Sequence, residues 1–522
     1  MADTKKYFTI EGLRKHNTRD DLWILIQGKT KVQIYKMEDG IKERLVYSNK
    51  KNGNELKDRI WEEVKTLSII AAPTIATRVA SFGIYMVTQA YMGRIGEIEL
   101  ASFALVETVI LRFVDGILLG MGSSLPTVCG EAFGAGQHHM MGIYLQQSWI
   151  IILTGSIFLI PAFIFTTPIL RFLGQVEELS KVAGELSPWF LPVFYFQVVG
   201  IPTQMYLQAQ LKIMIVGWVS VISFLVNMVL SWLMVNKLNR GVPGAMVAMI
   251  VSLSLVFFAQ HIYVFGGWCK ESWRGFSKSA FNELWPFLKL SLSSGVMLCL
   301  DLWNSTLLVL LVSYMKNAKV TLSAFSICLG INAWVYMVFL GVLSAASVRV
   351  ANELGKGNAK TAKFSIKVNL SISLIIGVIF SIVALVFSKS ISFLFTSSIE
   401  VAEEVSSLSV LLALVIFLNS VKASLTGMAI GTGRQSLVTY VNIFCYYVVG
   451  FPFGIFLGYV MQFQVKGIWT GMICGTAAQM LVLAYVTWKT DWDAQVDKSM
   501  GRLNRWVLPS SEEVSSGSTC HA

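Results

Sequence analysis

Residues 368–388 read VNLSISLIIGVIFSIVALVFS, an uncharged run between Lys367 and Lys389. A transmembrane helix needs about 20 consecutive, mostly apolar residues to cross the hydrocarbon core of a bilayer, so this run predicts one. The whole chain has the same character. Of its 522 residues only 14% are charged and the mean hydropathy is +0.62, whereas soluble domains carry about 25% charged residues. We therefore expect an all-α polytopic membrane protein.

Twelve segments have the length and composition of a membrane span. Eight of them contain no Lys, Arg, Asp or Glu: 132–170, 186–211, 213–236, 241–269, 320–348, 368–388, 435–465 and 467–488. Four more are apolar but contain charged residues: 67–92, 100–128, 286–315 and 405–430. The sequence thus predicts twelve transmembrane helices.

The basic residues near the ends of these segments predict the orientation of the chain. We count 20 Lys and Arg on the side shared by both termini and 9 on the opposite side. Basic residues are enriched on the cytoplasmic side of membrane proteins, so both termini are expected in the cytoplasm. The same enrichment explains the net charge of +11 without a nucleic-acid partner. Residues 1–20 are polar and do not form a cleavable signal peptide.

Two pairs of short matches indicate an internal repeat. Residues 100–103 (LASF) correspond to 322–325 (LSAF), and 134–136 (GAG) to 355–357 (GKG), at offsets of 222 and 221 residues. The matched spans are six apart, so both halves have the same orientation, as in transporters built from parallel repeats. This predicts four parts: an N-terminal extension at 1–60, six-helix lobes at 61–275 and 276–492, and a cytoplasmic tail at 493–522.

Motifs for enzyme chemistry and for bound cofactors are missing. Gly28-Lys29-Thr30 resembles the end of a phosphate-binding loop, but Trp23 occupies the position of its first glycine. His138 and His139 have no cysteine partner nearby, and the seven cysteines show no CxxC spacing. We therefore expect neither an enzyme nor a metal site, and any uphill transport would use an ion gradient.

Asp301 is the sharpest functional candidate, because it lies near the middle of the segment 286–315 with no basic residue within one turn. A carboxyl group removed from water favours its neutral form and can exchange protons near neutrality. The alternative is a structural hydrogen bond to a neighbouring helix. Lys422 lies about 12 Å from the end of its span at 1.5 Å per residue, too deep for full snorkelling. If the two helices are adjacent, Lys422 favours the charged form of Asp301; if they are apart, Asp301 is a simple proton carrier.

Other polar residues within the spans have a structural and a functional interpretation. Arg112 and Asp115 lie three residues apart and predict a self-neutralising pair, and Arg78 is expected to snorkel or to pair with Glu107. Interhelical hydrogen bonds are the simpler explanation for uncharged polar groups. The candidates for lining a cleft between the lobes, in addition to Lys422, are Trp303, Asn304, Gln204 and Asn332.

Three stretches together resemble the plant multidrug and toxic compound extrusion (MATE) transporters: residues 79–83 (VASFG), 129–136 (CGEAFGAG) and 347–355 (SVRVANELG). The resemblance runs from about Trp61 to Trp492. It implies a twelve-helix, two-lobe antiporter that exports organic compounds in exchange for protons or sodium.

The resemblance also assigns meaning to individual positions. Plant members usually carry an acidic residue after Cys-Leu in the seventh helix, and Asp301 fills that position. Members commonly have Gln where Glu131 stands and an acidic residue where Pro126 stands, which leaves a coupling role of the N-terminal lobe in doubt. Lys422 replaces a neutral polar residue.

Residues 7–29 resemble the opening of a cytochrome b5 haem domain. Gly40 stands where the first haem-ligating histidine is expected, and the His-Pro-Gly-Gly stretch is missing. A fragment this short cannot enclose haem, so we expect no haem and interpret the segment as a remnant of a fusion or of the gene model.

The leading hypothesis is a monomeric, proton-coupled antiporter in the vacuolar or plasma membrane that exports organic cations or neutral secondary metabolites and xenobiotics. Its partners would be the small-molecule substrate, protons and the lipid bilayer. A passive anion channel or an organic-anion exporter is the alternative, favoured by Lys422 and Pro126. An electron-transfer fusion protein is disfavoured because the haem ligands are absent.

Overall fold

The computed structural model describes residues 23–28, 31–36, 41–282, 284–313, 319–393, 395–396 and 398–504. The chain divides into two compact units, Met1–Glu63 and Val64–Ala522. In the first unit, the strands β1 (Trp23–Gly28) and β2 (Lys31–Lys36) pair antiparallel, with Trp23 opposite Lys36. Most of residues 7–29, the segment that resembles cytochrome b5, lies outside the described residues, as does Gly40, so that resemblance stays a prediction.

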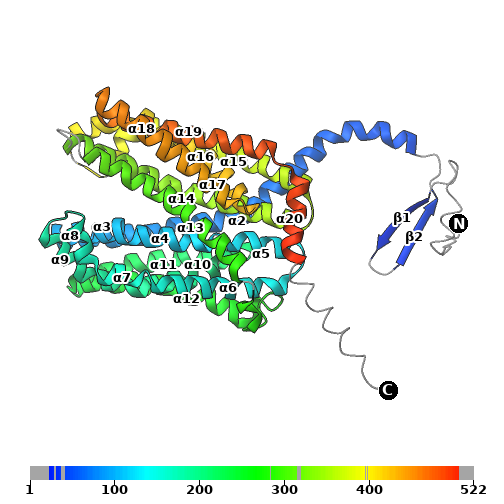
Figure 1. The fold of residues 1–522 in the computed structure, drawn as a ribbon, viewed down its shortest axis with the longest axis horizontal. Helices are drawn as coiled ribbons and strands as arrows, with labels where there is room; N and C mark the ends of the chain where they lie inside the picture. Colours follow the sequence, from blue (N-terminus) through cyan, green and yellow to red (C-terminus); the bar gives the residue numbers. More distant parts are fainter. Residues whose placement is uncertain are drawn as a thin grey trace, which may run out of the picture. The chain divides into compact units, whose positions relative to one another are not determined.

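The remaining elements are helical, and Figure 1 shows them as two bundles. The first bundle, here the N-terminal lobe, contains α2 (Ile41–Ile95, from Val64 onward), α3 (Glu97–Leu105), η1 (Val106–Leu111), α4 (Arg112–Gly122), α5 (Leu125–Gly134), α6 (His138–Ile157), α7 (Ile160–Ile164), α8 (Thr166–Phe172), α9 (Glu177–Leu186), η2 (Ser187–Phe190), α10 (Leu191–Ala209), α11 (Met214–Ser231), η3 (Trp232–Lys237), α12 (Gly241–Tyr263) and η4 (Val264–Trp268). The short helix η5 (Lys278–Phe281) leads to the second bundle.

The second bundle, here the C-terminal lobe, contains α13 (Leu284–Ser313), α14 (Lys319–Gly355), α15 (Ala359–Ser392), α16 (Ile399–Gly431), α17 (Gln435–Asn442), η6 (Ile443–Gly450), α18 (Phe451–Ile455), η7 (Phe456–Val460) and α19 (Gln464–Lys489). The last described helix is α20 (Trp492–Asn504). Of the helices labelled η, η2 and η5 are 3₁₀-helices and the others are π-helices.

Within the described residues, nine helices are long and apolar enough to cross a membrane. The other three expected spans are also helical. They correspond to the series α3, η1, α4 and α5, to η2 with α10, and to α13. The first of these contains Glu107, Arg112 and Asp115, which lower its hydropathy, and Pro126 opens its last helix, where a proline costs no backbone hydrogen bond.

Each lobe has its own apolar core. In the N-terminal lobe the core includes Phe103 and Phe194, both fully buried. In the C-terminal lobe Phe325 of α14 packs edge-on against Trp469 of α19, with 5.1 Å between the ring centroids. The two cores are not fully separate, because Phe287 of α13 and Leu503 of the later helix α20 pack into the core of the N-terminal lobe.

The lobes meet along α4 with α13 and along α5 with α14. In Figure 1 the two bundles lie closest near α5 and α20 and diverge toward α9 and α18. We call the region of closest approach the α20 end. Here a Cβ atom added at Gly134 would overlap the carbonyl oxygen of Asn352, and one added at Gly355 would overlap that of Glu131. These two contacts are related by the 221-residue offset of the repeat, so α5 and α14 cross with a local twofold relation.

This crossing predicts that Gly355→Ala destabilises the protein. The added methyl group has no space against the α5 backbone, and overpacking of this kind typically costs about 1–3 kcal/mol. Gly330→Ala is the matched control on the same helix, because a Cβ atom there meets nothing within 4 Å. Thermal unfolding in detergent is expected to show a lower midpoint for Gly355→Ala alone. Equal midpoints for the two variants would contradict the close crossing.

Candidate functional site

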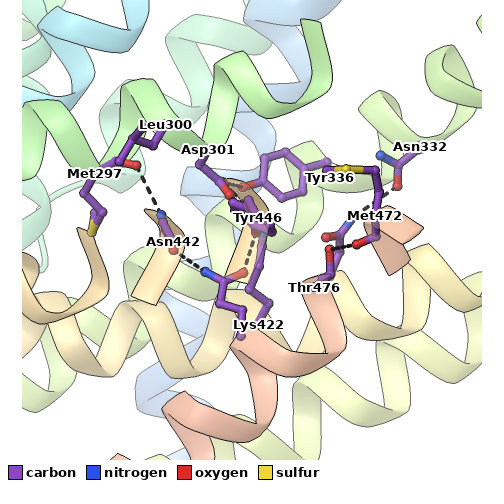
Figure 2. Close-up of polar contacts among 12 residues, drawn as sticks. Met297, Leu300, Asp301, Asn332, Tyr336, Lys422, Asn442, Tyr446, Met472 and Thr476 are labelled. Carbon is purple, nitrogen blue, oxygen red and sulfur yellow. Dashed lines mark hydrogen bonds and ion pairs between the residues drawn. The ribbon is translucent and has the colours of Figure 1, made fainter. Parts of the chain in front are cut away.

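Asp301 lies at the centre of a buried polar cluster in the C-terminal lobe (Figure 2). The Lys422 ammonium donates to both carboxylate oxygens, with Nζ 3.0 Å from Oδ1 and 3.3 Å from Oδ2. Two phenol groups complete the shell: Tyr336 donates to Oδ2 and Tyr446 to Oδ1, each at 3.0 Å. The side chains of Asp301 and Lys422 are only 15% and 9% exposed. We call these four residues the Asp301 cluster.

Four helices each supply one member of this cluster. Asp301 comes from α13, Tyr336 from α14, Lys422 from α16 and Tyr446 from the π-helix η6. A π-helical stretch inserts an extra residue into a helix and reorients the side chains that follow, and such stretches are frequent at functional sites. Here the stretch Ile443–Gly450 carries the tyrosine that contacts both charged groups, because Lys422 Nζ also lies 3.2 Å from the Tyr446 hydroxyl.

The donors around Asp301 match the ionised carboxylate. An ionised carboxylate only accepts hydrogen bonds, and here it receives them from one ammonium and two phenols. Hydrogen bonds that involve a charged partner are roughly twice as strong as neutral ones. The structure therefore shows the paired arrangement of Asp301 and Lys422, and not the isolated carboxyl of the alternative hypothesis.

A chain of hydrogen bonds continues from the cluster across the lobe. The Tyr446 hydroxyl has a second acceptor within hydrogen-bonding distance, Oε1 of Gln479, whose Nε2 donates to Oδ1 of Asn442 at 2.6 Å. Asn442 in turn donates to the carbonyl oxygen of Met297 at 3.3 Å, as Figure 2 shows. A phenol has a single proton, so Tyr446 donates to Asp301 or to Gln479 but not to both at once. This second acceptor lets Tyr446 turn away from Asp301 without losing a hydrogen bond.

The uncharged candidate residues have separate environments. Asn304 lies one turn after Asp301, and its buried Oδ1 has no hydrogen-bond partner within the part of the chain that the structure describes. Trp303 stacks on Phe113 of the N-terminal lobe, with ring centroids 5.8 Å apart and planes inclined by 7°. Asn332 accepts a hydrogen bond from Asn419 at 3.3 Å, which is the interhelical contact expected for amides.

Gln204 is partly buried on α10 in the N-terminal lobe, and no hydrogen bond joins it to the Asp301 cluster among the described residues. The structure therefore brings Asp301 and Lys422 together and leaves the other candidate residues outside their hydrogen bonds.

The partly buried charges of the N-terminal lobe do not pair as expected. Within the part of the chain that the structure describes, no ion pair joins Arg112 to Asp115 or Arg78 to Glu107. Instead Asp115 lies in the combined field of Arg112, Arg78 and Glu107, and its Oδ1 has no hydrogen-bond partner among the described residues. The spacing of three residues between Arg112 and Asp115 permits a contact on one helix. It cannot account for the charges that other helices bring close to Asp115, which are Arg78 from α2 and Glu107 from η1.

Sequence reasoning missed two residues of the Asp301 cluster, Tyr336 and Tyr446, and Gln479, which contacts Tyr446. Nothing in the sequence places these three residues near residue 301. The one available signal was the pair of unusual charges, Asp301 and Lys422, within spans of the same lobe. Because buried charges need hydrogen-bond partners, the sequence predicts polar side chains on the adjoining helices. It does not identify which side chains these are.

Comparison with known proteins gives the family. The MatE family model matches residues 73–233 and 294–456. The chain belongs to the MatE family. The two matches cover most of one lobe each and start 221 residues apart, the same offset that separates Gly134 from Gly355. The chain is also 49% identical to Protein DETOXIFICATION 20 of Arabidopsis thaliana, over 89% of this chain and 96% of that protein, and 48% identical to Protein DETOXIFICATION 21 of the same plant, over 90% and 96%.

Solved structures agree with the family assignment. The eukaryotic MATE transporter AtDTX14 superposes with a TM-score of 0.81 at 29% identity, covering 85% of this chain and 99% of that one. The Vibrio cholerae MATE transporter VcmN gives 0.75 at 15% identity, covering 83% and 99%, a likeness in fold alone. The expected all-α membrane fold with twelve transmembrane helices is thereby confirmed, as is the MATE resemblance. This MatE protein is an integral membrane protein related to transporters of small molecules.

Proposed function

We propose that this MatE protein is a secondary antiporter that exports organic cations or neutral organic compounds in exchange for protons, and that Asp301 is its proton-coupling residue. The observation that carries the proposal is the buried contact of Lys422 with Asp301, with Nζ 3.0 Å from Oδ1. The negative charge of a buried acid next to a single cation can be compensated in two ways. In one state the cation neutralises the carboxylate, and in the other a proton does.

Protonation of Asp301 would release Lys422. The neutral carboxylic acid no longer attracts the ammonium, and its new hydrogen needs an acceptor. Tyr446 then turns its proton toward Gln479 and offers its oxygen lone pairs to Asp301 and Lys422. The ion pair that ties α13 to α16 is lost in this state. A cationic substrate would compete with Lys422 for the same carboxylate, so that a proton and a substrate exclude each other, which is the requirement for exchange.

We also propose an orientation of the chain in the membrane. The bias of 20 to 9 basic residues supports termini in the cytoplasm, so the α20 end, where the lobes meet, would be the cytoplasmic end. The site would then open toward the vacuole lumen or the cell exterior. We further propose a monomer without haem or another cofactor.

Proteoliposomes with an imposed pH gradient test this function directly. Purified protein is reconstituted, and exchange of labelled organic cations, neutral compounds and organic anions is measured with the inside acidic, with no gradient, and with a sodium gradient. We expect accumulation of cations or neutral compounds that requires the proton gradient and collapses when a protonophore is added. Uptake driven by sodium alone, or not dependent on either gradient, would contradict proton exchange.

The alternative function, an anion channel or an organic-anion exporter, depended on Lys422 and on Pro126. The positive charge of Lys422 is neutralised by Asp301 and shielded by two tyrosine rings, whose centroids lie 5.5 and 5.8 Å from Nζ. Lys422 therefore offers no free charge to an anion in this conformation. Gradient-independent flux of anions in the same assay would favour the alternative.

A further inference from the structure

The helix α20 follows the C-terminal lobe in sequence but packs against both lobes. Near its start, Trp492 is buried among residues of α14, α15 and α16, including Val350 and Met428. Near its end, Leu503 is 2% exposed and belongs to the apolar core of the N-terminal lobe. The helix therefore crosses the boundary between the lobes at the α20 end.

A charged contact fixes the far end of this helix. The Arg502 guanidinium donates through Nε to Oε2 of Glu131 at 3.0 Å and through Nη2 to Oε1, a bidentate pair. Glu131 lies on α5 of the N-terminal lobe and is 1% exposed, whereas the Arg502 side chain is 32% exposed. A carboxylate buried to this degree needs a hydrogen-bonding partner. An arginine that donates two parallel hydrogen bonds is among the strongest partners available to it.

Further hydrogen bonds join α5 to the C-terminal lobe. Thr127 of α5 donates to the carbonyl oxygen of Ile430 in α16 at 2.6 Å, and Gln435 of α17 donates to Thr127 at 3.2 Å. The backbones of α5 and α14 are also in close contact at this end, at Gly134 and Gly355. Opening this end would break these bonds, withdraw Leu503 from the N-terminal core and leave the buried Glu131 without its arginine.

We propose that α20 is a strap that holds the lobes closed at this end, and that the Glu131–Arg502 pair sets how often the end opens. The inference rests on the proposed function, because alternating exposure of the site requires each end to open in turn. Glu131 and Arg502 would be positioning residues: they contact neither proton nor substrate, but they fix the balance between the two conformations.

The test measures the separation of the lobes without any substrate. Spin labels are attached through unnatural amino acids at His139 of α6 and Lys360 of α15, both exposed and in different lobes near the α20 end. Distance distributions are recorded in lipid nanodiscs for the wild type, Glu131→Gln, Arg502→Gln and the double variant. We expect each single variant to raise the ratio of open to closed populations at least about tenfold, since hydrogen bonds to charged groups are of this strength. The double variant is expected to raise this ratio little beyond the value of the more strongly affected single variant, because both substitutions remove the same contact.

Two further variants make the result specific. Lys498→Gln removes an exposed charge on the same helix and is expected to leave the distances unchanged. Arg502→Lys keeps the charge but loses the bidentate geometry, and is expected to give an intermediate population. Thermal unfolding confirms that each protein is folded, and the two Arg502 variants carry the test if Glu131→Gln is unstable. Wild-type distances in folded Arg502→Gln would overturn the strap, and because no proton gradient is used, that result is independent of the proposed antiport.

Discussion

Replacing Asp301 with asparagine is expected to abolish exchange driven by a pH gradient, with a loss of at least about a hundredfold, the scale of removing a proton-transfer group. The amide is nearly isosteric with the carboxylate, so Tyr336 and Tyr446 keep a neighbour of the same shape. It cannot take up a proton in the working range, and it carries no charge for Lys422 or a cationic substrate. The measurement is initial uptake into proteoliposomes under an imposed pH gradient.

Stability must be separated from coupling in this variant. Asp301→Asn leaves the Lys422 ammonium buried without a counter-ion, and removing one partner of a buried pair typically costs about 3–5 kcal/mol. The double variant Asp301→Asn with Lys422→Gln removes both charges and is expected to recover thermal stability but not transport. Undiminished pH-driven uptake by Asp301→Asn would rule out the proposed coupling residue.

Replacing Lys422 with glutamine is expected to move the pH optimum of exchange upward. In the wild type the ammonium stabilises the Asp301 carboxylate, so proton binding must displace it. Without the ammonium the buried carboxyl group is desolvated and has only its two tyrosine donors, so it retains a proton to higher pH. The rate of exchange as a function of pH, measured at a constant pH difference across the membrane, shows the displacement directly.

An exposed ion pair in the same lobe provides the control. Lys389 lies 3.5 Å from Glu403, and the two side chains are 49% and 65% exposed. Surface pairs contribute about 0–1 kcal/mol, so Lys389→Gln is expected to leave both the pH optimum and the melting temperature unchanged. If Lys422→Gln behaved like Lys389→Gln in both measurements, the buried pair would have no part in coupling.

Local sequence was sufficient for the membrane fold and for the repeat. A run such as 368–388 has only one stable solution in lipid, because a helix satisfies its own backbone hydrogen bonds. The offset of 221 residues between Gly134 and Gly355 was likewise visible without a structure, and the two family matches repeat it. Asp301 and Lys422 were identified as unusual because a charge within an apolar span is costly wherever its neighbours lie.

The tertiary structure alone decided which charges meet. Lys422 is 121 residues from Asp301 and Arg502 is 371 residues from Glu131, and both contacts form between helices that are distant in sequence. The expected pair of Arg112 and Asp115, three residues apart, does not form within the described residues. The tail predicted at 493–522 contains all of α20 except its first residue, Trp492. The apolar residues of α20 are too few to mark a span, but Trp492 and Leu503 are buried against the two lobes. The length of an apolar run can be read from one segment, and it is enough to predict a transmembrane helix. The pairing of buried charges depends on how the helices pack against one another, and that packing is determined by the whole chain.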